Sequence, residues 1–158
     1  MLRKLLVDRF NLRFHREQKE LSIYTLTVAR NGHKLRASTI SPDTSPQGPP
    51  PLLFVVSLPV VQLPGRYATI AELASVMQRS VLDRPVVDKT GISGRYDFDL
   101  EFTPDESLFG GALGKNTDDA NMPGLFSAIQ QQLGLRLQAA RGPVEALVID
   151  RAEPPSAN

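Results

Sequence analysis

The sequence of 158 residues has no cysteine, no tryptophan and only two histidines. Without cysteine, the chain has no disulfide framework, no thiol nucleophile and no thiolate metal site. An aromatic content of 6% argues against a base-stacking platform or a carbohydrate cleft. The formal net charge of +1 shows no marked excess of either sign, which argues against nucleic acid as a partner.

The sequence also has no long apolar run, and none approaches the ~20 residues that a membrane-spanning helix needs. Residues 1–7 begin like a signal peptide, but Asp8 and Arg9 end the apolar run before it reaches the length of an h-region. We therefore expect contact with a membrane only through a segment that this chain does not contain. The helix predicted over 1–10 has no N-cap residue, which indicates a helix that continues upstream.

The hydrophobic content of 41% and the charged content of 22% are typical of a soluble globular protein. The length predicts one domain over 1–151, with long loops or insertions at 37–66 and 105–122 and a tail at 152–158. Within the first of these loops, the apolar stretch 52–63 predicts an edge strand, or two short strands interrupted at Pro59.

Helical and strand patterns follow one another in a recurring order. Helices are expected at 1–10, at 70–77 after a capping box of Thr69 and Glu72, and from Pro123 to a cap at Gly134. Each helix precedes two predicted strands: 12–15 and 21–28 around a turn at 16–20, 81–87 and 95–102, and 135–137 and 144–149 around a turn at 141–143. The pattern predicts three helix–strand–strand units that share one mainly antiparallel or mixed sheet, with helices on one face. The fold class is therefore a two-layer α+β sandwich.

Two groups of residues are candidates for chemistry. Asp97, Asp99 and Glu101 alternate with apolar residues, so they share one face of a strand, where carboxylates could act as acid and base or bind a hard cation such as Ca²⁺. The same alternation is typical of the solvated face of any half-buried strand. His15 lies on the polar side of a predicted strand, without the pattern of a zinc site or a nucleophile elbow. The sequence therefore predicts no catalytic, cofactor-binding or metal-binding residues, and these four remain candidate surface residues.

Several segments together resemble a known family. They are RPVVDKTGISGRYDFDLEF at 84–102, LVDRFNLRFHRE at 6–17, LFSAIQQQLGL at 125–135, and GPVEALVID at 142–150 with the ending PSAN at 155–158. The combination resembles the Solibacter-type domain of unknown function found in soil Acidobacteria. Members of that family commonly look exported or membrane-tethered, so the resemblance implies a location in the periplasm or cell envelope. The order of elements in the second half is also similar to the short N-terminal domains of secretins and TonB-dependent receptors, which are periplasmic interaction modules.

These observations favour a non-enzymatic, extracytoplasmic interaction or sensing module. Its partner would be a protein or peptide, bound through a sheet edge or the loops at 37–66 and 105–122. The alternative is a hydrolase that uses His15 or the group Asp97, Asp99 and Glu101, and a third possibility is a binder of Ca²⁺ or a small ligand. We expect no cofactor, and the sequence does not define the oligomeric state.

Overall fold

The computed structural model describes residues 11–40, 51–113 and 122–152 of the chain. The chain divides into two compact units, Ser22–Ala140 and a smaller one that combines Met1–Leu21 with Arg141–Asn158. Two long strands, β1 (Arg13–Val28) and β7 (Leu135–Arg151), contribute residues to both units. The helix expected over 1–10 and nearly all of the expected tail lie outside the described residues. No helix within the described ranges has both the length and the apolar character that a bilayer span requires.

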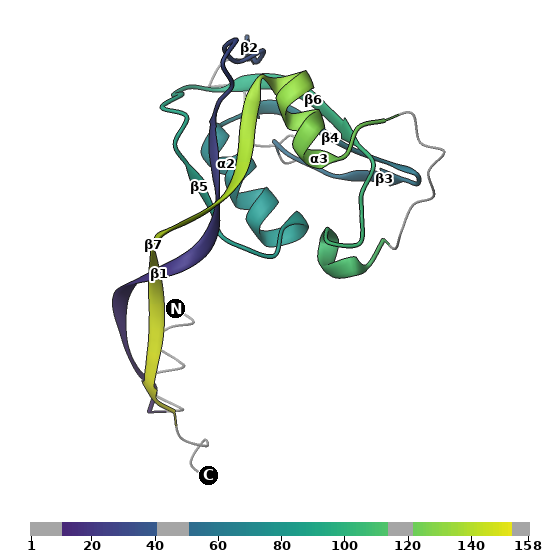
Figure 1. The fold of residues 1–158 in the computed structure, drawn as a ribbon. Coiled ribbons are helices and arrows are strands. Elements are labelled where there is room, and N and C mark those ends of the chain that lie inside the picture. The colour runs from purple at the N-terminus through teal and green to yellow at the C-terminus, as the bar shows by residue number, and fades with distance from the viewer. Residues whose placement is uncertain (1–10, 41–50, 114–121, 153–158) are drawn as a thin grey trace. The chain divides into compact units, whose positions relative to one another are not determined.

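The strands form two sheets (Figure 1). The first has the order β5-β1-β7, and the second the order β2-β6-β4-β3. The shorter strands are β2 (Arg36–Ala37), β3 (Val55–Ser57), β4 (Val60–Ala68), β5 (Val86–Asp88) and β6 (Tyr96–Phe102). The α+β content agrees with the prediction, but the single shared sheet does not. An alternating pattern shows which face of a strand is buried and leaves its pairing partner undetermined.

Two short helices contribute to the core of the larger unit, and local sequence signals place both. The helix α2 (Ile70–Val76) continues into the π-helical turn η2 (Met77–Val81), and α3 (Leu125–Ala128) continues into η4 (Ile129–Leu133). The predicted capping box is confirmed, because the Glu72 N–H donates to Thr69 Oγ1 over 3.1 Å and the Thr69 N–H donates to the Glu72 carboxylate over 2.8 Å. Gly134 ends the second helix in the left-handed conformation, as predicted.

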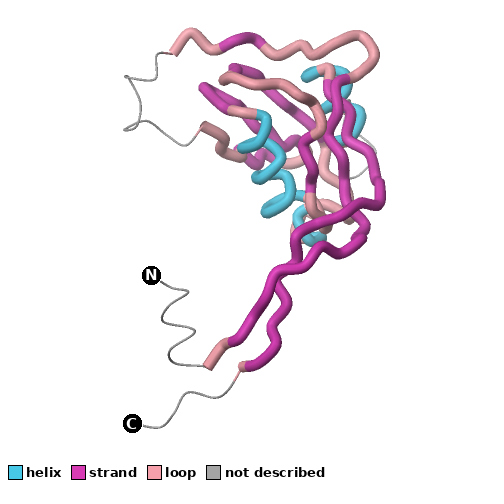
Figure 2. The backbone as a smooth tube through the Cα atoms, turned by 90° about the vertical axis from the view of Figure 1, so that its left-hand side faces the viewer, coloured by secondary structure: helices cyan, strands magenta, loops and turns pink. Residues whose placement is uncertain are grey.

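The core of the larger unit combines one face of each sheet with both helices, which Figure 2 shows in cyan among the strands. Strands β4 and β6 contribute an alternating set of buried side chains, and the helices contribute residues at helical spacing. The most fully buried large side chains include Leu63, Leu100, Phe102, Ile70, Leu73, Met77, Leu125, Ile129 and Leu133. Burying such side chains contributes about 1.5–3 kcal/mol each, which makes this cluster the main stabilising element of the unit.

Two predicted turns are instead parts of continuous strands. The polar stretch 16–20 lies inside β1, and 141–143 lies inside β7. The two strands are hydrogen-bonded neighbours, so pairing satisfies the backbone of both stretches despite their polar or proline-containing sequences. The middle segment 70–102 does follow the predicted order of helix, strand and strand, but the strand after η4 does not turn back. The threefold repeat is therefore not confirmed.

The described part of the smaller unit consists of 11–21 and 141–152, a ribbon of two strands. Arg16 forms an ion pair with Glu145 over 2.8 Å, and His15 bonds to Asp150 over 2.9 Å. Leu147 and Ile149 keep 51% and 59% of their surface exposed. An isolated two-stranded ribbon is marginally stable in water, so these cross-strand pairs matter for its order.

The predicted loop 37–66 contains β3 and most of β4, and the expected interruption at Pro59 lies between them. Only β3 is a short edge strand, because β4 continues to Ala68 and pairs on both sides, so the prediction of a loop is wrong for 60–66. In the predicted loop 105–122, the described residues include the short 3₁₀ turn η3 (Phe109–Gly111). Phe109 packs edge-on against Phe54 with ring centroids 5.5 Å apart, so both segments contribute side chains to the edge of the core.

Candidate functional site

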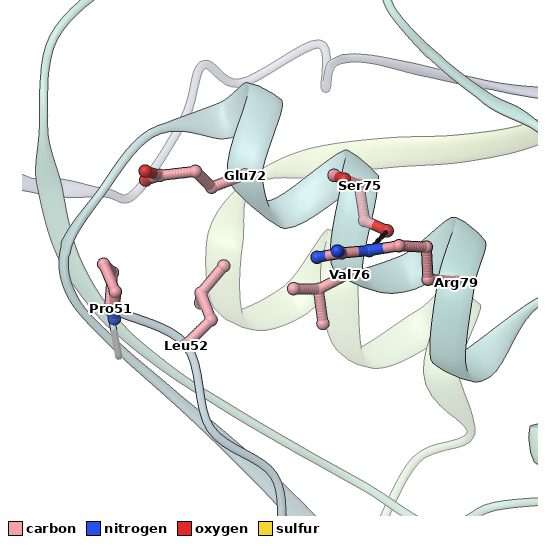
Figure 3. A pocket seen from close by; sticks show the side chains of 6 residues that line it. All are labelled: Pro51, Leu52, Glu72, Ser75, Val76 and Arg79. Atoms are coloured by element: carbon pink, nitrogen blue, oxygen red, sulfur yellow. Dashed lines mark hydrogen bonds between the residues drawn. The ribbon is translucent and has the colours of Figure 1, made fainter. Parts of the chain in front are cut away.

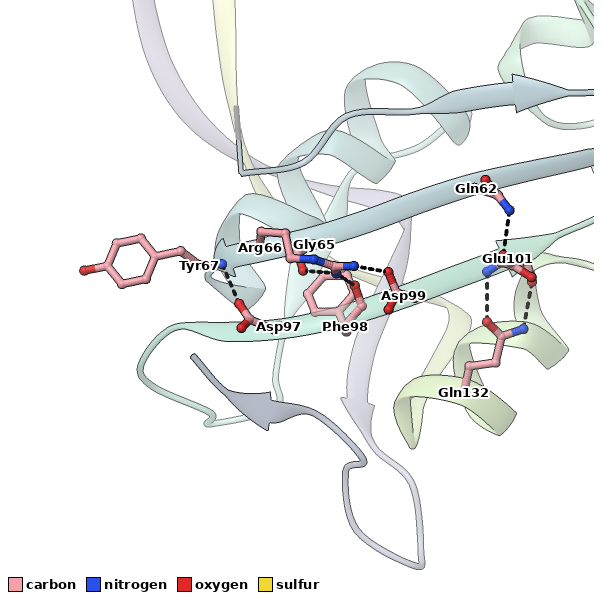
Figure 4. A network of polar contacts seen from close by, with 9 residues as sticks. All are labelled: Gln62, Gly65, Arg66, Tyr67, Asp97, Phe98, Asp99, Glu101 and Gln132. Atoms are coloured by element: carbon pink, nitrogen blue, oxygen red, sulfur yellow. Dashed lines mark hydrogen bonds and ion pairs between the residues drawn. The ribbon is translucent and has the colours of Figure 1, made fainter. Parts of the chain in front are cut away.

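The three carboxylates of β6 lie on its outward face, and each is bonded to a residue of β4 (Figure 4). Asp99 forms an ion pair with Arg66 over 2.6 Å, and Glu101 accepts a hydrogen bond of 2.6 Å from the Gln62 side chain. Each carboxylate thus has its own cross-strand partner. These cross-strand pairs stabilise the sheet. The three carboxylates do not point to one shared position where a substrate or a metal could bind.

Asp97 stabilises a bulge in β4, where the register shifts between Gly65 and Ala68. Tyr67 has a positive φ of 54° at this point, and its N–H donates to Asp97 Oδ1 over 2.8 Å. Arg95 donates to the Tyr67 carbonyl over 2.7 Å, and its guanidinium lies 4.6 Å from the centroid of the Tyr67 ring. The hydrogen bond from the Tyr67 N–H lowers the pKa of Asp97 below its usual value, so the group is an ionised structural acceptor.

His15 lies in the smaller unit, with a carboxylate near each ring nitrogen. Nδ1 is 2.9 Å from Asp150 Oδ1, and Nε2 is 3.6 Å from Glu17 Oε2. The hydrogen bond to Asp150, followed by the charge of Asp150, raises the pKa of His15 above its usual value. Among the residues that the structure describes, no hydroxyl group is bonded to this imidazole. The geometry supports a charged cross-strand pair more directly than a general base next to a nucleophile.

The described ranges contain no group of three or more His, Asp or Glu side chains placed to hold a metal ion. The Ca²⁺ hypothesis for Asp97, Asp99 and Glu101 therefore gains no support from their arrangement.

The edges of the two sheets differ in how their free backbone groups are satisfied. Strand β6 pairs with β2 only at 96–97, so the rest of that side of β6 is also an edge. There the side-chain amide of Gln132 accepts from the Glu101 N–H over 2.8 Å and donates to the Glu101 carbonyl over 2.7 Å. On the β5 edge, the Val86 N–H donates to the Gln78 side chain over 3.1 Å. Two other edge strands contain charged residues. Strand β2 contains Arg36, and β7 contains several charged residues and a proline. Such features protect an edge from pairing with another chain.

Within the described residues, the edge formed by β3 and the residues just before it has no comparable protection. Leu52 pairs with Gly65 in an isolated bridge, and Val55–Ser57 pair with β4 in the same antiparallel register. Residues 53–54 lie between these pairs, outside β3. The Arg66 N–H donates to the Pro51 carbonyl over 2.9 Å. Because hydrogen-bonded and non-hydrogen-bonded positions alternate in an antiparallel ladder, the N–H and C=O groups of Leu52, Phe54 and Val56 point away from β4. In the described part of the chain, nothing bonds to these outward groups.

The side chains along this edge are apolar and accessible. Leu53, Val55, Val56 and Leu58 keep 55%, 46%, 50% and 52% of their surfaces exposed. The segment 51–58 contains no charged residue. Exposed apolar side chains next to free backbone groups are the features that an added strand requires.

A hollow of about 180 Å³ adjoins the start of this edge (Figure 3). Pro51 and Leu52 form one side of it, and α2 with the following turn forms the other. The lining residues from the helix are Glu72, Ser75, Val76 and Arg79. Leu52 and Val76 contribute apolar surface to the lining, and Glu72 and Arg79 contribute one charge of each sign.

The sequence predicted an edge strand at this place and named a sheet edge as a binding surface. It did not reveal the hollow, because that depends on how α2 packs beside residues 51–52. It also did not reveal the two glutamine side chains that cover the other edges. Gln132 follows two further glutamines in the sequence, so nothing local distinguishes the one that reaches β6.

Comparison with known proteins gives one family. The family model described as "Protein of unknown function (DUF3738)" matches residues 1–152. No curated protein and no solved structure matches the chain.

Proposed function

The chain belongs to the DUF3738 family of proteins of unknown function, and from this premise we propose that it is a non-enzymatic interaction module. The module binds an extended, uncharged segment of a partner protein, which adds a strand to the edge at 52–57. The observation that carries this proposal is that the outward-pointing backbone groups of this edge have no partner among the described residues, while glutamine side chains cover the β5 and β6 edges.

The chemistry of the edge supports an apolar strand as its ligand. An added strand would pair with the outward N–H and C=O groups of Leu52, Phe54 and Val56. Its side chains would contact the exposed Leu53 and Val55 on one face of the sheet. A charged segment would gain no partner, because 51–58 is uncharged.

The hydrolase alternative has less support. Asp97, Asp99 and Glu101 each bond to a structural partner, and both nitrogens of His15 face carboxylates. None of these groups lines the hollow beside Leu52.

The test uses a synthetic peptide of alternating threonine and valine, eight residues long and blocked at both ends. We expect binding to slow the amide exchange of Leu52, Phe54 and Val56 and to shift their NMR resonances. Val56→Pro removes one outward N–H without removing a bond to β4, so it should weaken binding about three- to tenfold, the effect of losing one hydrogen bond. Val56→Thr keeps the N–H and serves as the matched control. Resonance shifts that map to β7, or equal binding by the two variants, would refute the proposal.

We also propose that the module acts in the periplasm or cell envelope. Its support is the resemblance of several sequence segments to the Solibacter-type family, whose members commonly look exported or membrane-tethered. Fractionation of cells that express the natural gene with a C-terminal epitope tag tests this location. Recovery in the periplasmic or envelope fraction is expected, and recovery in the cytosol would contradict it.

A further inference from the structure

We propose that the hollow beside Leu52 receives the C-terminal residue of the bound segment, with an apolar last side chain inside it and the terminal carboxylate at Arg79. This inference rests on the proposed function, because the hollow adjoins the edge that the segment would extend. It specifies the ligand as the free C-terminus of a partner protein.

The size and lining of the hollow fit one apolar side chain. Its volume of about 180 Å³ exceeds the roughly 150 Å³ of an apolar cavity that binds benzene. Leu52 and Val76 face each other across it in Figure 3, with Pro51 beside them. A leucine or phenylalanine side chain would contact apolar surface here, whereas glycine would leave the hollow empty.

The charged residues of the lining favour a carboxylate. Glu72 is already engaged, since it accepts from the Thr69 N–H over 2.8 Å and lies 3.3 Å from Arg95. Among the described residues, the guanidinium of Arg79 makes one hydrogen bond, in which Nε donates to the Ser75 carbonyl over 3.2 Å. Its two terminal nitrogens have no partner within the described residues, and Figure 3 shows the guanidinium extending over Val76 toward Leu52. A guanidinium fork matches the geometry of a carboxylate.

The position of the hollow also sets the direction of the ligand. The edge runs from Leu52, next to the hollow, to Val56, toward the turn into β4. A segment that ends at Arg79 therefore runs antiparallel to the edge. Its last residues, about five of them, would pair with the outward groups of Leu52, Phe54 and Val56.

The experiment compares two fluorescent peptides that differ only at the C-terminus. Both have alternating threonine and valine and end in leucine, one as the free acid and the other as the amide. We expect the free acid to bind about tenfold more tightly, by fluorescence anisotropy at low salt, and the difference to shrink as salt rises. Replacing the last leucine by glycine should weaken both peptides.

Variants of the protein identify the group responsible. Arg79→Gln should abolish the preference for the free acid while leaving the affinity for the amide unchanged, and Arg79→Lys should restore part of it. Arg30→Gln removes the same charge from an exposed arginine that does not line the hollow, and should preserve the preference. If the amide binds as tightly as the acid, the assignment of a C-terminus is wrong while edge binding stands. If neither peptide binds, the proposed function fails as well.

Discussion

Replacing Gly134 by alanine should destabilise the larger unit more than the same change at Gly91. Gly134 has a φ of +64° and Gly91 a φ of +67°, so alanine meets nearly the same backbone strain at both positions. Their surroundings differ. A Cβ at Gly134 would contact the carbonyl oxygen of Gly32 and lie 2.9 Å from both the Cα of His33 and the N of Lys34, whereas a Cβ at Gly91 would meet nothing within 4 Å.

The close contacts at Gly134 involve backbone atoms that are held in place. The Ala29 N–H donates to the Gly134 carbonyl over 2.9 Å, and the Lys34 N–H donates to the Leu133 carbonyl over 2.8 Å. Lys34 Nζ also donates to the Gln131 carbonyl over 2.7 Å at the end of the helix. The segment 29–34 therefore cannot move away from the added methyl group without losing these bonds.

The two variants separate strain from crowding. We expect about 1 kcal/mol of destabilisation for Gly91→Ala, since the strain of a left-handed alanine is partly offset by the lower entropy of its unfolded chain. Crowding in a packed site adds about 1–3 kcal/mol at Gly134. For a chain of this length, the Gly134→Ala variant should therefore melt about 2–12 °C below the Gly91→Ala variant.

Urea unfolding and thermal melting, both followed by circular dichroism, measure the difference. Equal destabilisation by the two substitutions would show that the segment 29–34 does not pack against Gly134 as described. A larger effect at Gly91 would refute the reasoning altogether.

Three further predictions concern single contacts. Thr69→Ala should lower the free energy of unfolding by about 1 kcal/mol in urea titrations through loss of the N-cap, while Thr69→Ser should recover most of it. Gln132→Leu should cost about 1–3 kcal/mol by leaving the Glu101 N–H and carbonyl unpaired, and faster exchange of the Glu101 amide would confirm the cause. Because the pKa of His15 is raised in the folded state, the stability it contributes is complete below its unfolded value near pH ~6.5 and is lost as pH rises through the folded value. An NMR titration should show a lower pKa of His15 in Asp150→Asn, and an unchanged pKa would contradict the pairing.

Features that depend on neighbouring residues could be predicted from the sequence. The capping box of Thr69 and Glu72 and the left-handed Gly134 use groups within a few positions of each other. The outward face of β6 follows from strict alternation over 96–102, so the exposed position of its carboxylates could be predicted as well. The interruption between β3 and β4 follows from Pro59, which cannot donate to a ladder.

Features that depend on pairing between distant segments could not be predicted in the same way. The stretch 16–20 resembles a turn by composition, yet it is a strand because β7, more than a hundred residues later, lies beside it. The division into two sheets has the same origin, since many pairings of strands satisfy one set of alternating patterns.

The candidate site likewise combines features that consecutive residues determine with features that depend on distant segments. The sequence by itself determined that 51–58 is apolar, uncharged and suited to an edge strand, because these are properties of consecutive residues. Only the tertiary structure decided that no described residue covers this edge while Gln132 and Gln78 cover others, and that α2 leaves a hollow beside Leu52. A side chain can satisfy a backbone group or line a hollow only after packing has brought distant segments within a few ångströms, and that distance is not encoded in any local pattern.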